Sequence, residues 1–475
     1  MTSEQFEYHE LVLVPLTPIH VGGGDEAHLG PEDYRLKGLF LERVDLGSFL
    51  LSAPDCETLL RDMSRDLPRT LSVIRDRIPD GAVTERIAVS QEACDELRPI
   101  FRPSNDRGPR RQEVVHAFLR SGGFPTLPGS SLKGCLRTAW LARCTRDQAI
   151  SERDLGRGKS GKRSDRLTEM AFAINENETA TDPFRDVTVT DSRLPESATR
   201  VDTVSGWKYD RDKEAYTANP SSKIQLMRER LRSVTDGGEP PVVHVRIGFR
   251  FDHVRERRSE AARSDSHPKL SPKSIFEMLS ALEDHHAPLW KRETGKFFSG
   301  TGQRLEQALG LFAGLSRGGN QPVAALARIG WAAHAEAKSI AGFRAIHRPQ
   351  PQFRGKKGEY VTEGSARHVV DLPDGPSPFG WALLVMADKW RAGKDSITWL
   401  PAGQAKKHHS REQSRSDPGF RKGLELKYRK GGIVYLEDGS TATLLEDVRE
   451  GQSEVQAEID GGVEPVKVSE IEGLA

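Results

Sequence analysis

The chain has 475 residues, 36% of them hydrophobic and 29% charged, and a mean hydropathy of −0.57. This length is sufficient for two or three domains, and no run of about 18 apolar residues is present to span a membrane. The N-terminus lacks the basic and then apolar pattern of an export signal. The four cysteines are scattered, so we expect reduced thiols in a cytoplasmic protein rather than disulfides or a zinc ribbon.

The net charge of +1 is unevenly distributed. Residues 437–475 hold eleven acidic residues against Arg449 and Lys467, which leaves the rest of the chain strongly basic. Two clusters, 143–166 and 246–273, each hold eight basic and four acidic residues. Such clusters can neutralise phosphates. A mixed-charge run is more often simply a solvated surface, so the clusters alone are weak evidence.

The first predicted element is a strand over residues 10–20, which is apolar and β-branched. Pro15 and Pro18 lack a backbone donor, so this strand should lie at a sheet edge or break before His20. Val21 and the three glycines Gly22–Gly24 then form a turn where another backbone can approach closely.

The next elements alternate between short strands and single helices. Residues 125–131 read as a loop, 132–144 as a helix capped by Ser130 or Ser131, and 156–166 as a mobile loop without apolar residues. The other predicted helices are 55–78, 274–282 and 303–315, and the other strands are 34–44 (a pair), 114–119, 187–190, 242–251, 325–331 and 380–388. This order favours an α+β fold with antiparallel sheets. After a basic linker, four short strands predict a small acidic β-domain at the C-terminus.

The most informative segment is PGSSLKGCLR at 128–137. A glycine and two serines precede a helix that carries Lys133 and Arg137 one turn apart. Free backbone donors and two cations on one helix face are suited to a phosphodiester. The spacing is not that of a phosphate-binding loop of nucleotide hydrolases, so that activity is not predicted. An ordinary loop with a capped helix is the alternative interpretation.

Five segments together resemble the repeat-associated mysterious proteins, or RAMP superfamily, of CRISPR-associated RNA-binding subunits. They are, in chain order, LTPIHVGGG at 16–24, PGSSLKGCLR at 128–137, DPFRDVTVTDS at 182–192, RIGW at 328–331 and PFGW at 378–381. The start of the chain and its size resemble most the subunit that caps the crRNA 3′ side of the type III-A (Csm) complex.

The resemblance implies two ferredoxin-like, RRM-related modules, 1–255 and 256–395. The linker, 396–431, and the acidic β-domain, 432–475, are predicted from the sequence itself, and the acidic tail falls outside the resemblance. The resemblance also implies a non-catalytic subunit whose partners are crRNA and related RAMP subunits, with no membrane, cofactor or metal. The residues expected at RNA are His20, Gly22, Gly23, Gly24, Ser130, Ser131, Lys133, Arg137 and Arg328.

Two other functions remain open from the sequence. RAMP relatives that process precursor crRNA often use a histidine near the N-terminus, so His20 with Lys133 could cleave RNA without metal. A structural histidine is the commoner case, and Asp25 and Asp33, near the position of a target-cutting aspartate, are more often turn residues. Alternatively, the acidic tail could recruit a trimming nuclease of the host, which would make the chain an adaptor.

Histidine pairs and aromatic residues give weaker indications. His285–His286 and His408–His409 have no further ligands nearby in the sequence, so a metal site is not expected. The aromatic residues considered for base stacking are Trp207, Tyr209, Trp290, Phe297 and Phe298.

Overall fold

Contacts divide the chain into two compact units, Met1–Gln404 and Ala405–Ala475. The computed structural model describes residues 6–24, 28–98, 114–155, 160–174, 182–210, 215–218, 226–250, 270–315, 317–318, 321–348, 359–402, 433–436, 441–445, 454–459, 462–467 and 471–474. Within these residues, no helix is both long enough and apolar enough to cross a bilayer.

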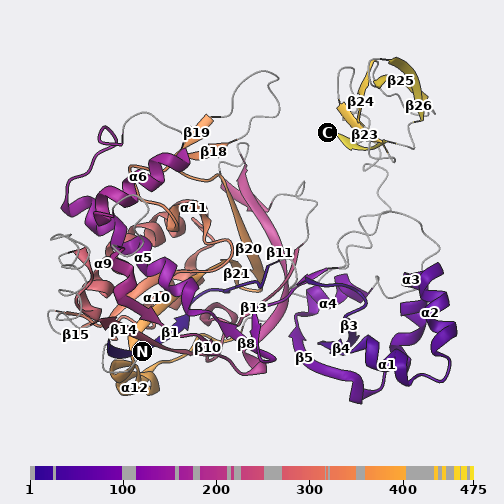
Figure 1. The fold of residues 1–475 in the computed structure, drawn as a ribbon, viewed down its shortest axis with the longest axis horizontal. Helices are drawn as coiled ribbons and strands as arrows, with labels where there is room; N and C mark the ends of the chain where they lie inside the picture. Colours follow the sequence, from indigo (N-terminus) through magenta and orange to yellow (C-terminus); the bar gives the residue numbers. More distant parts are fainter. Residues whose placement is uncertain are drawn as a thin grey trace. The chain divides into compact units, whose positions relative to one another are not determined.

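A five-stranded antiparallel sheet organises the first unit (Figure 1). Its strands, in spatial order, are β17 (Ala324–Arg328), β22 (Trp381–Met386), β1 (Phe6–Pro15), β14 (Val243–Arg250) and β9 (Val187–Val189). The α+β class with antiparallel sheets is therefore confirmed. Strands from both sides of residue 255 share this sheet, and the division into two ferredoxin-like modules stays a prediction.

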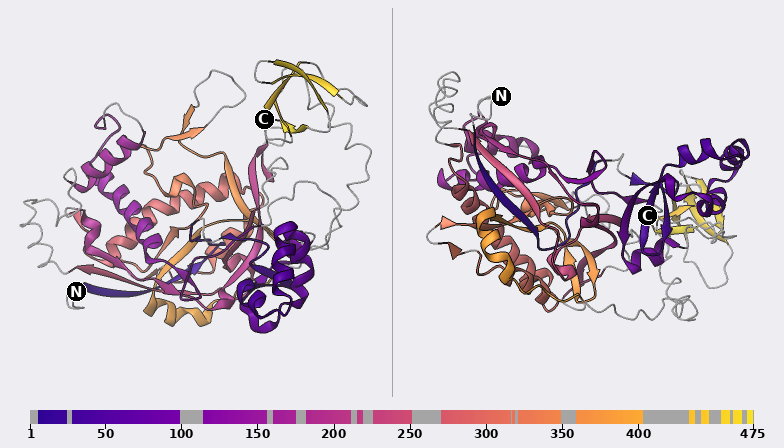
Figure 2. Two further views of the ribbon diagram at one scale, coloured as in Figure 1. Left: turned by 45° about the vertical axis from the view of Figure 1, so that its right-hand side comes forward. Right: turned by 90° about the horizontal axis from the view of Figure 1, so that it is seen from below.

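The central strand β1 is buried on both faces because its apolar side chains alternate between two cores. Leu11 and Leu13 belong to one core, together with helices α5 (Gly129–Asp147) and α9 (Ile275–Arg292). Val12 and Val14 belong to the other. Figure 2 shows β1, in indigo, beside its partner β14.

The opposite core is closed by shorter helical segments. These are the π-helix η10 (Glu293–Phe297) and the α-helices α10 (Gln303–Gly310) and α12 (Ala387–Gly393). β1 ends at Pro15, before His20, although it lies inside the sheet rather than at its edge. The predicted break is thus confirmed, because two prolines within four residues cannot donate to a ladder.

A ten-stranded sheet forms the other large layer of the first unit. Its main path runs β2 (His28–Leu29), β6 (Val115–His116), β13 (Leu226–Leu231), β11 (Thr199–Asp210), β5 (Val83–Val89), β4 (Phe40–Val44) and β3 (Tyr34–Lys37), and β12 (Ala215–Ala218), β20 (Ala366–Leu372) and β21 (Gly375–Pro378) join it off this path. The register places His28 opposite His116, and His116 opposite Arg228. Three neighbouring strands therefore carry these side chains in a row.

Several predicted elements differ from the structure. The segment 125–131, expected as a loop, instead contains most of β8 (Phe124–Leu127) and the start of α5. The helix expected over 55–78 is two helices, α2 (Cys56–Arg65) and α3 (Leu67–Ile74), because Pro68 starts a new helix after Asp66. The segment expected as a mobile loop contributes to α6 (Ser160–Phe172). That prediction was wrong because Leu167, Ala171 and Phe172 at the far end of the helix pack into the core.

The remaining elements of the first unit are small. They are α1 (Leu46–Ser52), α4 (Gln91–Leu97), α11 (His334–Ala337), a three-stranded sheet of β7 (Arg120–Ser121), β8 (Phe124–Leu127) and β10 (Ser192–Arg193), and the pairs β15 (Arg317–Gly318) with β16 (Gln321–Pro322) and β18 (Ile346–Arg348) with β19 (Glu359–Val361).

The second unit is a five-stranded antiparallel sheet, where the sequence predicted four strands. The strands are β23 (Ile433–Leu436), β24 (Thr441–Leu444), β25 (Glu454–Ile459), β26 (Gly462–Lys467) and β27 (Ile471–Leu474). The additional strand appears because the last predicted strand is divided between β26 and β27.

Candidate nucleic-acid interface

Helix α5 begins at Gly129, earlier than the sequence predicted, with Pro128 as its N-cap. Ser130 and Ser131 therefore lie in the first turn, and the prediction that one of them caps the helix is wrong. The carboxylate of Asp191 accepts a hydrogen bond of 2.7 Å from the Gly129 amide. A Cβ at position 129 would lie 2.3 Å from the carbonyl oxygen of Val189, so only glycine allows this approach to β9.

Lys133 and Arg137 lie one turn apart on α5, and both are half-buried. Arg137 donates to Asp182 at 3.0 Å, and its guanidinium carbon lies 5.0 Å from the centre of the Phe172 ring. Burial lowers the pKa of Lys133, and the nearby charge of Arg137 adds to this effect while Asp182 opposes it. Asp182 pairs with Arg137, and Asp191 accepts from the Gly129 amide, so carboxylates already stand beside both the cations and the first amide of the helix.

Arg137 also lines a cleft of about 630 Å³ between α5, α6 and residues 335–346. Its basic lining residues are Arg137, Arg163, Lys338 and Arg344, whereas Glu152 is its one acidic lining residue among those described. Glu152 pairs with Arg163 at 3.2 Å. The cleft is therefore basic and open to solvent, which suits a polyanion.

His20 is buried, with 2% of its surface exposed. Its Nδ1 lies 2.6 Å from the backbone carbonyl oxygen of Glu229, and its Nε2 lies 3.0 Å from the guanidinium of Arg228. An arginine can only donate, so Nε2 accepts and Nδ1 carries the proton of a neutral ring. Burial lowers the pKa of His20 to about 3. In this geometry His20 holds the strand β13 against the first glycine turn.

The turn Gly22–Gly24 is exposed and lies beside His20. A Cβ at Gly22 would come within 3.2 Å of His20 Nε2, and Gly24 has a φ of +86°. Gly330, with a φ of +81°, approaches the other side of His20, since a Cβ there would lie 2.5 Å from its carbonyl oxygen. The amide of Trp331 donates to that same carbonyl at 2.7 Å. The turn Gly22–Gly24 at the start of the RAMP-like pattern and Gly330 near its end thus both lie next to His20.

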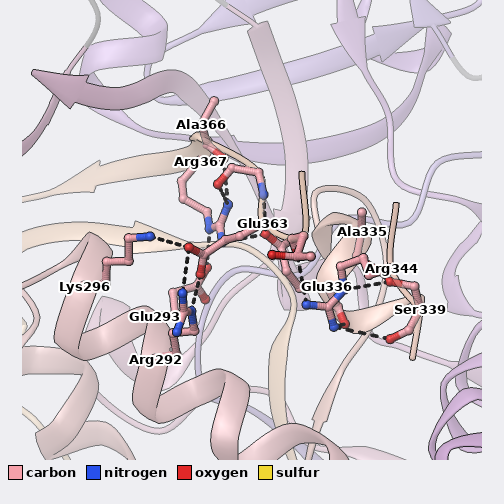
Figure 3. A network of polar contacts seen from close by, with 12 residues as sticks. Arg292, Glu293, Lys296, Ala335, Glu336, Ser339, Arg344, Glu363, Ala366 and Arg367 are labelled. Atoms are coloured by element: carbon pink, nitrogen blue, oxygen red, sulfur yellow. Dashed lines mark hydrogen bonds and ion pairs between the residues drawn. The ribbon is translucent and has the colours of Figure 1, made fainter. Parts of the chain in front are cut away.

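Arg328 lies in a buried ion network rather than on an open surface. It is 3% exposed, donates to Glu293 at 3.0 Å, and packs against the Trp381 ring. Arg367 donates to the same carboxylate at 2.7 Å. Figure 3 shows Arg367 paired with Glu293 and with Glu336, and Glu363 paired separately with Arg292 and Lys296. Arg328 is therefore buried, and an RNA strand does not reach it unless the surrounding side chains rearrange.

The histidines, aspartates and aromatic residues that the sequence indicated more weakly have structural roles where the structure describes them. His286 is fully buried against Cys135, and the described residues contain no group of three or more metal-binding side chains. Asp33 accepts from the Gly30 amide in a turn. Trp290, Phe297 and Phe298 are core residues, whereas Trp207 is half-buried. Asp25, His408 and His409 lie outside the described residues.

The sequence analysis missed Arg228, which the structure places beside His20. Its guanidinium carbon lies 3.7 Å from the centre of the Trp331 ring. His28 and His116 stand next to it on the neighbouring strands, with their rings 4.3 Å apart. No motif could have revealed this group, because its members come from three strands and a loop far apart in the sequence.

Two comparisons place this architecture among known proteins. The family model of the RAMP superfamily matches residues 12–319, and the chain therefore belongs to that superfamily. Its fold is similar to a chain in the cryo-EM structure of a Csm–crRNA–target RNA ternary complex of a type III-A CRISPR-Cas system, with a TM-score of 0.51 and 17% identity over 79% of this chain and 100% of that chain.

A second similar structure is the crystal structure of T. onnurineus Csm5, with a TM-score of 0.45 and 17% identity over 79% of this chain and 99% of that chain. A search of curated protein sequences found no match. At 17% identity the similarity to the chain of the Csm complex shows the kind of fold, and the family model shows the superfamily.

Proposed function

We propose that this chain is a crRNA-binding subunit of a type III CRISPR ribonucleoprotein and holds the 3′ side of the crRNA at one end of a row of related subunits. Membership in the RAMP superfamily and the similarity in fold to a chain of a Csm complex support this role. Its partners are then crRNA and neighbouring RAMP subunits.

The observation that carries the proposal is the start of α5. Ser130, Lys133 and Arg137 reach the surface there, and Arg137 continues into the basic cleft lined by α6. Backbone amides and cations of this kind contact phosphates and position a strand without reading its sequence.

The test is a double substitution, Lys133→Ala with Arg137→Ala, in the reconstituted complex. Each lost contact to a charged group costs on the order of 1.5–3 kcal/mol, so RNA retention should fall sharply. Arg61 and Arg65 form a matched control because they are exposed and share the same spacing on α2. Unchanged RNA content in the α5 variant, or an equal loss in the α2 variant, would count against the proposal.

We also propose that the chain is not itself a nuclease. Support comes from His20, whose two ring nitrogens are both engaged and whose pKa of about 3 makes it a weak base. Incubation of the purified chain with repeat-containing RNA, with and without a chelator, should give no cleavage. Cleavage that disappears in His20→Ala would establish the endoribonuclease alternative instead.

A further inference from the structure

Arg228 is a buried cation that lacks a carboxylate partner among the described residues. It lies on β13 with 8% of its surface exposed. Among the described residues its guanidinium donates a hydrogen bond to His20 Nε2, and its Nε has no hydrogen-bond partner. Arg230, two residues further along the same strand, is fully buried but pairs with both Asp202 and Asp236. The two arginines therefore differ in whether the fold supplies a counter-charge.

An unpaired buried charge is costly, and proteins usually pair it or neutralise it. Desolvation lowers the pKa of Arg228 to about 10, so the guanidinium still carries its charge at neutral pH. The Trp331 ring covers one face of it, which offsets part of the cost through a cation–π contact. Its Nε is buried without a hydrogen-bond partner, so the fold leaves a donor of this guanidinium unsatisfied.

Most groups around Arg228 are neutral or cationic. One acid, Asp202, lies opposite it on β11 but pairs with Arg200 and Arg230. His116 and His28 continue the row across β6 and β2, and His368 on β20 lies against Trp331, with ring centres 4.9 Å apart. His28 is exposed, and His116, Trp331 and His368 are half-buried, so the row reaches solvent. Because Asp202 is engaged by two other arginines, the donors that remain favour an anion over a cation or a neutral ligand.

The geometry points to a second anion site, in which Arg228, backed by Trp331 and flanked by His116 and His368, binds one phosphate group of an RNA strand. This inference rests on the proposed function for the identity of the strand, but it concerns residues separate from Lys133 and Arg137. The guanidinium donates to phosphate oxygens through a nitrogen that His20 does not engage, and such charge-assisted hydrogen bonds are typical of arginine with this group. The exposed turn Gly22–Gly24 lies next to His20 at the same place.

The experiment compares the wild type with Arg228→Gln, which removes the charge while retaining a polar side chain of similar length. Inorganic phosphate, added at constant ionic strength against chloride, should raise the Tm of the wild type by roughly 1–3 °C. It should leave the Tm of Arg228→Gln unchanged. The affinity for a short RNA oligonucleotide should fall roughly ten- to one-hundred-fold in the variant. The slope of log affinity against log salt should decrease by about 0.7, the value for one phosphate of a single strand.

Arg228→Lys and Arg61→Gln complete the design. Lysine keeps the charge and loses the planar fork, so Arg228→Lys should retain the salt slope of the wild type with a weaker phosphate response. Arg61→Gln removes an exposed cation on α2 and should match the wild type in every measurement. If Arg228→Gln fails to fold, the comparison of Arg228→Lys with the wild type decides: an undiminished phosphate response contradicts the site.

Two further outcomes overturn the inference. The first is wild-type RNA affinity and salt slope in folded Arg228→Gln. The second is a Tm of the wild type that does not respond to phosphate. A separate variant tests the proposed function. Lys133→Ala with Arg137→Ala should weaken RNA binding and leave the response of the Tm to phosphate through Arg228 intact. If RNA affinity is unchanged in that double variant, the proposed function fails, and the response of the Tm to phosphate still tests the Arg228 site independently.

Discussion

At the scale of single residues, the buried arginines differ in whether the fold gives them a carboxylate partner. Arg230 and Arg328 are enclosed with carboxylates, so their charges are balanced inside the protein. Removing one partner of such a pair leaves the other charge uncompensated, and these residues therefore hold the fold together. Arg228 has no such partner among the described residues, and its charge is balanced only when an anion arrives. Binding residues are commonly those that the free protein stabilises least.

Buried neutral histidines make the stability of the first unit depend on pH. The pKa of His20 is about 3 in the folded chain, against a reference value of 6.5. Because the unfolded chain binds the proton more readily, the contribution of His20 is complete above pH 6.5 and decreases as the pH falls toward 3. At pH 5 this loss amounts to about 2 kcal/mol. The buried His286 has its pKa shifted in the same direction.

Urea unfolding at pH 7 and pH 5 measures this dependence. The wild type should be less stable at pH 5, and His20→Gln should lose less stability between the two pH values than the wild type does. An identical decrease in both proteins would show that His20 is not the group that titrates. The comparison uses the difference between pH values, so a constant effect of the substitution on folding does not disturb it.

At the scale of elements, apolar runs made the strands of the central sheet predictable. β17, β22 and the second half of β1 are apolar runs buried on both faces, whereas β14 alternates apolar and polar residues and buries one face, in agreement with their sequences. β11 was not predicted, because its few apolar residues do not alternate regularly with polar ones and Gly206 interrupts the segment. α6 was missed for a related reason: its first turns are polar, and the three residues that anchor it come at the end.

The candidate site was predictable only where it is continuous in the sequence. The segment that begins α5 is a local motif, so Lys133 and Arg137 were found, although their pairing with Asp182 was not. Arg328 was expected at RNA because the motif around it does not show its ion-pair partner. That partner, Glu293, lies thirty-five residues earlier in the sequence. Arg228 could not be found, because what distinguishes it is the absence of a partner, and only the folded sheet reveals that.

Two glycines on α5 allow the packing of this helix to be tested. Gly129→Ala places a methyl group against the Val189 carbonyl, and overpacking of this kind costs typically 1–3 kcal/mol. Gly134→Ala is the matched control, since a Cβ there meets nothing within 4 Å. It should stabilise the helix by up to about 1 kcal/mol. A Tm of Gly129→Ala that equals or exceeds the Tm of Gly134→Ala would contradict the tight approach of α5 to β9.

At the scale of the whole molecule, the chain joins a basic unit to an acidic one. The C-terminal residues 437–475 carry eleven acidic side chains, which disfavour contact with a polyanion. The second unit has its own five-stranded sheet, and the RAMP family model ends at residue 319, well before it. We therefore expect the RNA-binding role to belong to the first unit and the second unit to contact protein.

Deletion of residues 432–475 tests this division. The shortened chain should bind RNA with the affinity of the full chain, because the phosphate-binding residues all precede residue 405. If the second unit recruits a trimming nuclease or a neighbouring subunit, capture of that protein by the assembled complex should be lost. A loss of RNA affinity on deletion would show instead that the second unit supports the RNA site.

The most direct measurement is a structure of this chain in its assembled ribonucleoprotein. We expect RNA phosphate oxygens at hydrogen-bonding distance, about 2.7–3.2 Å, from Lys133 Nζ or the Arg137 guanidinium at the start of α5. A map in which that surface is covered by another subunit, or faces solvent with the nucleotides elsewhere, would contradict the proposed role of the helix.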